Sequence, residues 1–285
     1  MKSRWFINIL LLLAIGALIL VARYEPGIEE EPQTPAVTTL SKDQVRRIHI
    51  NRPVRDDLVL AKDAHDNWTI ERAPALPADK LQVNALVKLA EQKAIRSYPV
   101  SELDLAKLEL DPPYAAMVLN NTAIEFGSLD PLEGLRYLRV ADRVHLVPDL
   151  YQHLIDADYT QFVRRRLFDD NASIARISLP DFSVTMENGK WTVQPQQEVS
   201  ADTLQRFVEA WQNASALHTK AAGKQQTDES IEVVLQNPEQ RIAFLIAATE
   251  PELVLIRQDF GIQFRMGALG SRLLELNQPA PNDQQ

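Results

Sequence analysis

The sequence comprises 285 residues with 30 basic and 39 acidic side chains, nine glycines and no cysteine. The formal net charge of −9 excludes proteins that hold nucleic acid through an excess of basic side chains. Without cysteine, the chain forms neither disulfides nor thiolate sites.

The first residues predict a membrane anchor. Residues 5–22 (WFINILLLLAIGALILVA) form an apolar run whose single strongly polar member is Asn8. A helix of this length spans about 27 Å, close to the hydrocarbon core of about 30 Å. Lys2 and Arg4 lie in the stub at 1–4, which we expect in the cytoplasm, and acidic residues crowd the other end. The sequence therefore predicts a single-pass protein of the inner (cytoplasmic) membrane with a periplasmic C-terminal part.

A cleaved signal peptide is the alternative for this segment. Such a peptide needs a small residue at the third position before the cut, and Leu20 stands there if the cut precedes Arg23. An uncleaved anchor is therefore favoured. The chain after residue 23 keeps 27 basic and 39 acidic residues, a net charge of −12, which argues against nucleic acid and against lying along an anionic bilayer.

The remaining chain divides by composition and periodicity. We expect a flexible linker at 23–44, a first α+β repeat at 45–160, a connection at 161–173, a second α+β repeat at 174–276 and a disordered tail at 277–285. The linker and the tail are rich in Pro, Glu, Thr or Gln and have no apolar period, so neither can bury enough surface to fold.

An internal repeat carries the fold prediction. The segments 67–82 (NWTIERAPALPADKLQ) and 190–205 (KWTVQPQQEVSADTLQ) share six of sixteen residues at a constant offset of 123. Six identities exceed the roughly one expected by chance, so the similarity indicates duplication. We expect each copy to be an antiparallel β meander backed by a helix.

Apolar alternation places the strands of each copy. In the first copy we expect strands at 45–50, 58–62, 68–71, 116–119, 123–127, 136–140 and 144–147. In the second copy we expect them at 174–179, 183–187, 191–194, 231–235, 241–246, 253–257 and 262–266. Asn188-Gly189 predicts a type I′ hairpin turn, and short helices at 149–157 and 269–276 are expected to close the two copies.

A longer helix follows the third strand in each copy. We expect Pro77 at its first helical position with Asp79 in the first turn, and Ser200 as the N-cap of the second helix. Trp68 and Trp191 are expected to pack beneath these helices. The alternative, in which the two indoles form a paired ligand platform, is less favoured because the repeated residues also start the helix.

Candidate sites for chemistry are weak. The loop KDAHDN brings Asp63, His65 and Asp66 together, but the second copy has a plain turn there, so a solvated hairpin loop is favoured over a metal site. His145 and His153 flank a strand–helix junction and are expected to be structural. Nucleophile elbows and phosphate loops are absent from the sequence. We therefore predict no catalytic, cofactor-binding or metal-binding residues and a protein that is not an enzyme.

Clusters of like-charged residues are the remaining candidate sites. The acidic pairs Asp56-Asp57, Asp156 with Asp158, and Asp169-Asp170 are expected to be solvated. The basic run 164–166 (RRR) could meet an acidic partner or a headgroup. Pairing with Asp169 and Asp170, or capping of the preceding helix, is favoured.

An ordered set of motifs resembles a known family. The motifs are LELDPPYAAMVL at 108–119, IEFG at 124–127, RYLR at 136–139, VHLVPDL at 144–150 and RRRLFDD at 164–170. They resemble the bacterial domain-of-unknown-function family DUF4340 over most of 45–170, with a weak extension to about 276. Glu109 departs from the family pattern, which has Gly before Leu-Asp-x-Pro. The resemblance implies membrane-anchored auxiliary components of ABC-type transport systems and supplies no catalytic residues.

Three functions follow in order of preference. The first is a non-enzymatic accessory or scaffold protein, anchored in the membrane, whose partner is a membrane or periplasmic protein and not nucleic acid. The second is a module that binds a small periplasmic ligand or glycan between the two repeats. The third is a hydrolase that uses two separated carboxylates.

Overall fold

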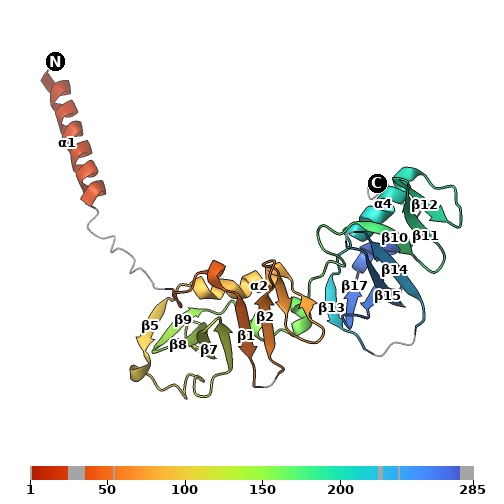
Figure 1. Cartoon of the computed structure of the whole chain (residues 1–285). Coiled ribbons are helices and arrows are strands. Elements are labelled where there is room, and N and C mark those ends of the chain that lie inside the picture. Colours follow the sequence, from red (N-terminus) through yellow and green to blue (C-terminus); the bar gives the residue numbers. More distant parts are fainter. Residues whose placement is uncertain (1, 25–35, 54, 224–226, 237, 277–285) are drawn as a thin grey trace.

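The computed structural model describes residues 2–24, 36–53, 55–223, 227–236 and 238–276. It consists of an N-terminal helix and two β-rich lobes (Figure 1). Residues 25–35 of the predicted linker at 23–44 and the whole of the predicted tail at 277–285 lie outside the described residues. In the described part of the linker, Val37 is 3% exposed and its amide donates to the Gln92 carbonyl at 2.7 Å, so this part packs on the first lobe.

Helix α1 (Lys2–Tyr24) contains the apolar run. Its described side chains, Trp5 and those at 8–21, are exposed, and Leu12 is 70% exposed. Within the part of the chain that the structure describes, no helix is both long and apolar enough to cross a membrane.

The first lobe is built on a nine-stranded antiparallel sheet in the order β4-β3-β2-β1-β6-β7-β8-β9-β5. Its elements are η1 (Lys42–Gln44), β1 (Arg47–Asn51), β2 (Leu58–Lys62), β3 (Trp68–Ile70), β4 (Leu76–Pro77), α2 (Lys80–Val87), η2 (Lys88–Glu91), β5 (Arg96–Pro99), η3 (Val100–Glu102), β6 (Ala115–Leu119), β7 (Thr122–Leu129), β8 (Leu135–Val140), β9 (Arg143–Pro148), α3 (Gln152–Ile155) and η4 (Tyr159–Phe162).

The second lobe is built on an eight-stranded antiparallel sheet in the order β12-β11-β10-β14-β15-β16-β17-β13. Its elements are β10 (Ile174–Ser178), β11 (Ser183–Glu187), β12 (Lys190–Gln194), α4 (Ala201–Gln212), β13 (His218–Ala221), β14 (Ser230–Leu235), β15 (Gln240–Ala248), β16 (Val254–Arg257), β17 (Ile262–Arg265) and η5 (Gly267–Leu273).

The two sheets have the same strand order apart from β4. In each lobe, three meandering strands form one end of the sheet, and the strand after the helix lies at the opposite edge beside the last strand. All strand pairs are antiparallel, for example Ile48 opposite Leu60 in the first lobe and Ile177 opposite Val184 in the second. The predicted α+β class with two antiparallel sheets is therefore confirmed.

The alternation seen in the sequence produces the cores. Ile48 and Ile50 of β1 are fully buried, whereas the strand's end residues Arg47 and Asn51 are exposed. Helix α4 buries Leu204, Phe207, Val208 and Trp211 on one face. The Trp211 indole donates to the Leu273 carbonyl at 2.9 Å, so the buried ring has its polar group satisfied.

Several local predictions are confirmed. Asn188 and Gly189 have φ of 50° and 77°, as a type I′ turn requires. Ser200 caps α4 by accepting from the Thr203 amide at 3.1 Å. Trp68 is 6% exposed, and the partly buried Trp191 donates from its indole to Gln205 of α4 at 3.0 Å.

Other predictions were wrong in detail. Pro77 belongs to β4, opposite Thr69, and Asp79 is the N-cap of α2 and not a first-turn residue. Helix α3 is shorter than the predicted 149–157, and the helix predicted at 269–276 is the 3-10 segment η5. The edge strands β5 and β13 were missed because they bury almost no side chains, so their sequences show no apolar alternation.

Glu109 occupies a backbone position that suits glycine. Its φ is 54°, in the left-handed region, and its side chain is exposed at a turn in which its amide donates to the Ala106 carbonyl at 3.2 Å. A residue with a Cβ is strained there. This strain explains the glycine that the family resemblance leads one to expect.

We predict that Glu109→Gly stabilises the protein by about 0.5–1 kcal/mol, because glycine removes the left-handed strain. Urea denaturation of the two proteins measures this difference. Glu109→Ala is the matched control, since it removes the same charge and keeps a Cβ. If alanine stabilises as much as glycine, the effect comes from the carboxylate and the explanation by backbone strain is wrong.

Candidate functional site

The segment at 162–167 joins the two lobes through hydrogen bonds on both of its edges. On one edge, Asp79 N donates to Phe162 O at 2.7 Å and Arg164 N donates to Pro77 O at 2.9 Å. On the other edge, Ala216 N donates to Arg165 O at 2.9 Å and Leu167 N donates to Ala214 O at 3.1 Å. Successive residues of an extended chain direct their main-chain groups to opposite sides, so this short segment, with one isolated bridge to each lobe, binds both.

Apolar side chains fix this junction in place. Phe162, Val163 and Leu167 are fully buried. Phe168 packs edge-on against Phe244 of β15, with ring centroids 5.9 Å apart. Thr219 of β13 donates its hydroxyl to the Thr160 carbonyl at 2.6 Å. The predicted connection at 161–173 thus contains a buried centre at 162–168 that packs on both lobes, whereas residues 169–171 are exposed.

The three arginines of the run lie within this junction, and each has an acidic partner. Arg164 pairs with Asp169, Arg166 with Asp170 at 3.5 Å, and Arg165 with Asp79 at 3.5 Å. The predicted pairing of the run with Asp169 and Asp170 is confirmed. The third partner comes from the N-cap of α2, on the other side of the junction.

A cleft of ≈ 770 Å³ opens above the arginines. Its walls come from the β2–β3 hairpin, the start of α2 and the segment around Ser215. Its ionic side chains are Asp63, Asp79, Lys80, Arg164, Arg165, Arg166, Asp169 and Asp170. Four cations and four carboxylates therefore share one cleft, which is polar and close to neutral.

Two of the arginines do not use all their donors. The Nε atoms of Arg164 and Arg166 are buried and have no hydrogen-bond partner among the described residues. Arg164 donates to Asp169 through Nη1, whereas Arg166 approaches Asp170 with Nη1 and donates from Nη2 to the Gln212 carbonyl at 3.2 Å. Arginine can instead bind an oxyanion through two parallel N–H groups, so these contacts are incomplete.

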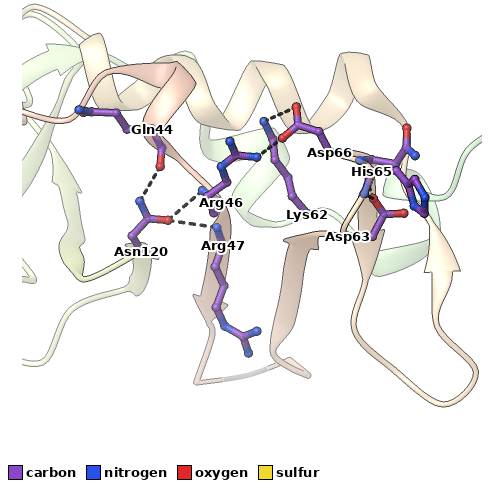
Figure 2. Close-up of polar contacts among 9 residues, drawn as sticks. Gln44, Arg46, Arg47, Lys62, Asp63, His65, Asp66 and Asn120 are labelled. Atoms are coloured by element: carbon purple, nitrogen blue, oxygen red, sulfur yellow. Dashed lines mark hydrogen bonds and ion pairs between the residues drawn. The ribbon is translucent and has the colours of Figure 1, made fainter.

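The KDAHDN loop is organised by local contacts (Figure 2). Asp63 accepts from the His65 and Asn67 amides at 2.8 and 2.9 Å, and the Asn67 bond is the main cause of its lowered pKa. The hydrogen bond from Lys62 chiefly lowers the pKa of Asp66, which also pairs with Arg46. Among the described residues, no group of three His, Cys, Asp or Glu could hold a metal.

A neighbouring asparagine organises the start of the first sheet (Figure 2). The Asn120 side chain, in the β6–β7 turn, accepts from the Arg46 and Arg47 amides at 2.8 and 3.1 Å and donates to the Gln44 carbonyl at 2.8 Å. These contacts direct the chain into β1. The cluster around Asn120 therefore has a structural role.

His145 and His153 lie in different environments. His145 of β9 is 4% exposed, and its Nδ1 lies 2.7 Å from the Ser97 hydroxyl of β5. Burial, with a smaller effect of Arg143, lowers the pKa of His145. His153 lies exposed on α3. The serine–histidine pair is partly buried and links the edge strand β5 to β9.

The neighbouring acidic residues singled out in the sequence contact different partners. The Asp57 carboxylate accepts from His49 at 2.8 Å, which is the main cause of its lowered pKa, whereas Asp56 offers its carbonyl to Arg52. Asp156 accepts from the Tyr114 hydroxyl, and this bond raises the pKa of Tyr114.

Among the ion pairs of the described residues, the four carboxylates with the least exposed side chains each pair with an arginine. They are Asp79, Asp149, Glu125 and Glu252, whose partners are Arg165, Arg136, Arg139 and Arg265. This arrangement does not favour the separated acid and base of a hydrolase.

The comparison with family models decides the relationship of this chain. The model for the domain of unknown function DUF4340 matches residues 68–236, more than half of the sequence. The chain belongs to the DUF4340 family. The match runs through both lobes of this DUF4340 protein and includes the whole junction. Neither the curated proteins nor the solved structures contain a match.

The cleft of the DUF4340 protein was only partly foreseeable. The basic run drew attention in an acidic chain, and the apolar residues on both sides of it, Phe162-Val163 and Leu167-Phe168, were a signal that it lies near a core. Lys80 and Ser215 carried no such signal. Long-range contacts bring them to the cleft.

Asp79 and Asp202 are aligned in the repeat but have different roles. Asp79 caps α2 by accepting from the Leu81 and Gln82 amides at 2.9 and 3.2 Å, and it also pairs with Arg165. Asp202 lies in the first turn of α4, which Ser200 caps. We predict that Asp79→Ala costs about 1–2 kcal/mol of stability and that Asp202→Ala costs about 0.5 kcal/mol. Thermal denaturation compares the two, and equal losses would contradict the assigned cap.

His145 should make stability depend on pH. Because its pKa is below 6.5 in the folded protein, the unfolded chain binds the proton first as the pH falls. Stability should be complete above pH 6.5 and should decline below it until the folded histidine also titrates. Urea midpoints at pH 7.5 and pH 5.5 measure the decline, and His145→Gln should reduce it. The carboxyls of Asp57, Asp63 and Asp66 have pKa values below the ordinary 3.8, so their contribution to stability is lost only at lower pH than this range. An unchanged decline in the variant would rule out this origin.

Proposed function

We propose that this DUF4340 protein is a membrane-anchored periplasmic accessory protein without enzymatic activity, which holds two lobes ready for a partner protein in the envelope. An ABC-type transport complex is the proposed setting, as the family resemblance suggests. The open edge of β12 is the single observation that carries the proposal.

The apolar run supports the anchor. Residues 5–22 have the length of a bilayer core, Lys2 and Arg4 precede them, and the described side chains of α1 are exposed. A solvent-exposed row that includes Leu12, Leu13 and Leu18 needs an apolar environment. We propose that lipid provides it.

The strand orders support duplication. The shared order of the two sheets, together with the gapless similarity of 67–82 and 190–205, is what two copies of one unit would give. We propose on this basis that the lobes are repeats at 45–160 and 174–276. If the lobes are repeats, β12 of the second sheet corresponds to β3 of the first.

The corresponding edges differ between the lobes. In the first lobe β4 covers β3, and Ala78 N donates to Trp68 O at 2.9 Å. In the second lobe β12 is the last strand, and its pairing with β11 leaves the main chain of Trp191 and Val193 directed outward. An exposed strand edge of this kind can bind an extended segment of another protein.

The cleft supports a second candidate function. Its volume of ≈ 770 Å³ lies within the range of about 300–1,000 Å³ for small-ligand sites, and charged groups converge in it. A module that binds a small solute between the lobes is therefore the alternative.

We predict that a photo-crosslinking residue at Gln194, on β12, captures a discrete partner in living cells. Val193→Pro should reduce the yield about tenfold, because proline removes the outward N–H without touching the ladder to β11. Val193→Ala keeps the N–H and is the matched control. The product should sediment with membranes and be degraded by protease added to spheroplasts.

Two outcomes would contradict the proposal. Equal yields from the proline and alanine variants would show that β12 does not pair with the partner. Protection of the lobes from external protease would show that they are cytoplasmic.

A further inference from the structure

We propose that the interlobe cleft binds a small phosphate-bearing dianion, and that Asp169 and Asp170 occupy its arginines as an internal competitor. This inference goes beyond a role as an anchored platform. It rests on the geometry of the arginine run and on the charges that line the cleft.

Arg164 and Arg166 form a matched pair of cations. They are two residues apart in an extended segment, so their side chains leave the same face with Cα atoms about 6.6 Å apart. Main-chain hydrogen bonds hold the segment on both edges, which fixes the two arginines relative to each other. The backbone beneath the pair therefore needs no ordering when an anion binds, and only the side chains have to move.

The aspartates that neutralise this pair are easily displaced. Asp169 and Asp170 have side chains that are 79% and 76% exposed. Ion pairs with such exposed groups contribute little to stability. Arg165, in contrast, is held by Asp79, whose side chain is 14% exposed. Two arginines can therefore exchange partners while the third stays in place.

The two Nε donors without a partner favour the binding of an oxyanion. The buried Nε atoms of Arg164 and Arg166 lack partners among the described residues, although Arg166 Nη2 donates to the Gln212 carbonyl at 3.2 Å. A phosphate that draws the guanidinium outward can accept from Nε and Nη together. Arginine suits phosphate recognition because its planar donors match two phosphate oxygens.

The charge of the opened cleft matches a dianion. Once Asp169 and Asp170 turn outward, Lys80 and three arginines face Asp63 and Asp79, which leaves a net charge of +2. The surrounding chain is acidic and repels anions at long range, but at about 0.15 M salt that repulsion is screened beyond about 8 Å. Recognition therefore depends on the contacts inside the cleft.

The test is calorimetric titration of the full chain in neutral detergent with inorganic phosphate, glycerol phosphate, succinate and short-chain phosphatidic acid. The double variant Asp169→Asn with Asp170→Asn should bind the phosphates about tenfold more tightly than the wild type, because the competing charges are gone. Arg164→Gln with Arg166→Gln should bind at least about tenfold more weakly. Arg241→Gln, an exposed substitution on β15, is the control.

The results separate the possible sources and can overturn the site. Stronger binding of phosphatidic acid than of glycerol phosphate assigns the ligand to lipid headgroups, and the reverse assigns it to free solutes. Succinate equal to the phosphates would overturn the preference for phosphate. If the asparagine variant binds no anion more tightly than the wild type, the aspartates are structural partners and the proposal is wrong. Circular dichroism verifies the fold of each variant.

Discussion

The central link between the two lobes is one extended segment that is hydrogen-bonded to both of them. Residues 162–167 give the main-chain groups of one edge to Pro77 and Asp79 and those of the other edge to Ala214 and Ala216. A strand cannot slip along one neighbour without breaking its bonds to the other. The position of each lobe is thus set by the register of the same few residues, and buried Phe162, Val163 and Leu167 prevent water from replacing these bonds.

This constraint also explains why three arginines can stand together in the junction. Their backbone is hydrogen-bonded, so the run cannot relax by moving apart, and each guanidinium must find its own partner nearby. Asp79, Asp169 and Asp170 supply the partners. A fully buried run would suffer a large desolvation cost, but these side chains keep roughly a quarter to two-fifths of their surface exposed. A cleft above the run is the consequence of keeping it hydrated.

The sequence predicts what is local and misses what is long-range. Alternating residues in β1, the Asn188-Gly189 turn and the Ser200 cap depend on neighbours in sequence, and the structure has all of them. In β10 a register shift interrupts the alternation, and the buried residues are Ile174 and Ile177. Pro77 was assigned to a helix because proline suits a helix start, but its carbonyl is held by Arg164, far away in the chain. The candidate site follows the same rule. Asp169 lies five residues from Arg164 and was expected as its partner, whereas Asp79 could be found only from the fold.

Strand β4, which has no counterpart in the second sheet, is also the strand to which the junction is hydrogen-bonded. In the first lobe β4 covers β3 on one side, and Ala78, which follows it, pairs with Val163 on the other, so this edge is closed by the connection itself. In the second lobe Val199 stands at the position aligned with Leu76, packs partly against the core and belongs to no strand. Only one copy of a duplicated unit can receive the connecting segment at this edge. On the proposed duplication, the free edge of β12 is therefore a direct geometric result of joining two such units in tandem. The edge of the first lobe is therefore occupied by the connection, whereas β12 stays at the edge of the second sheet.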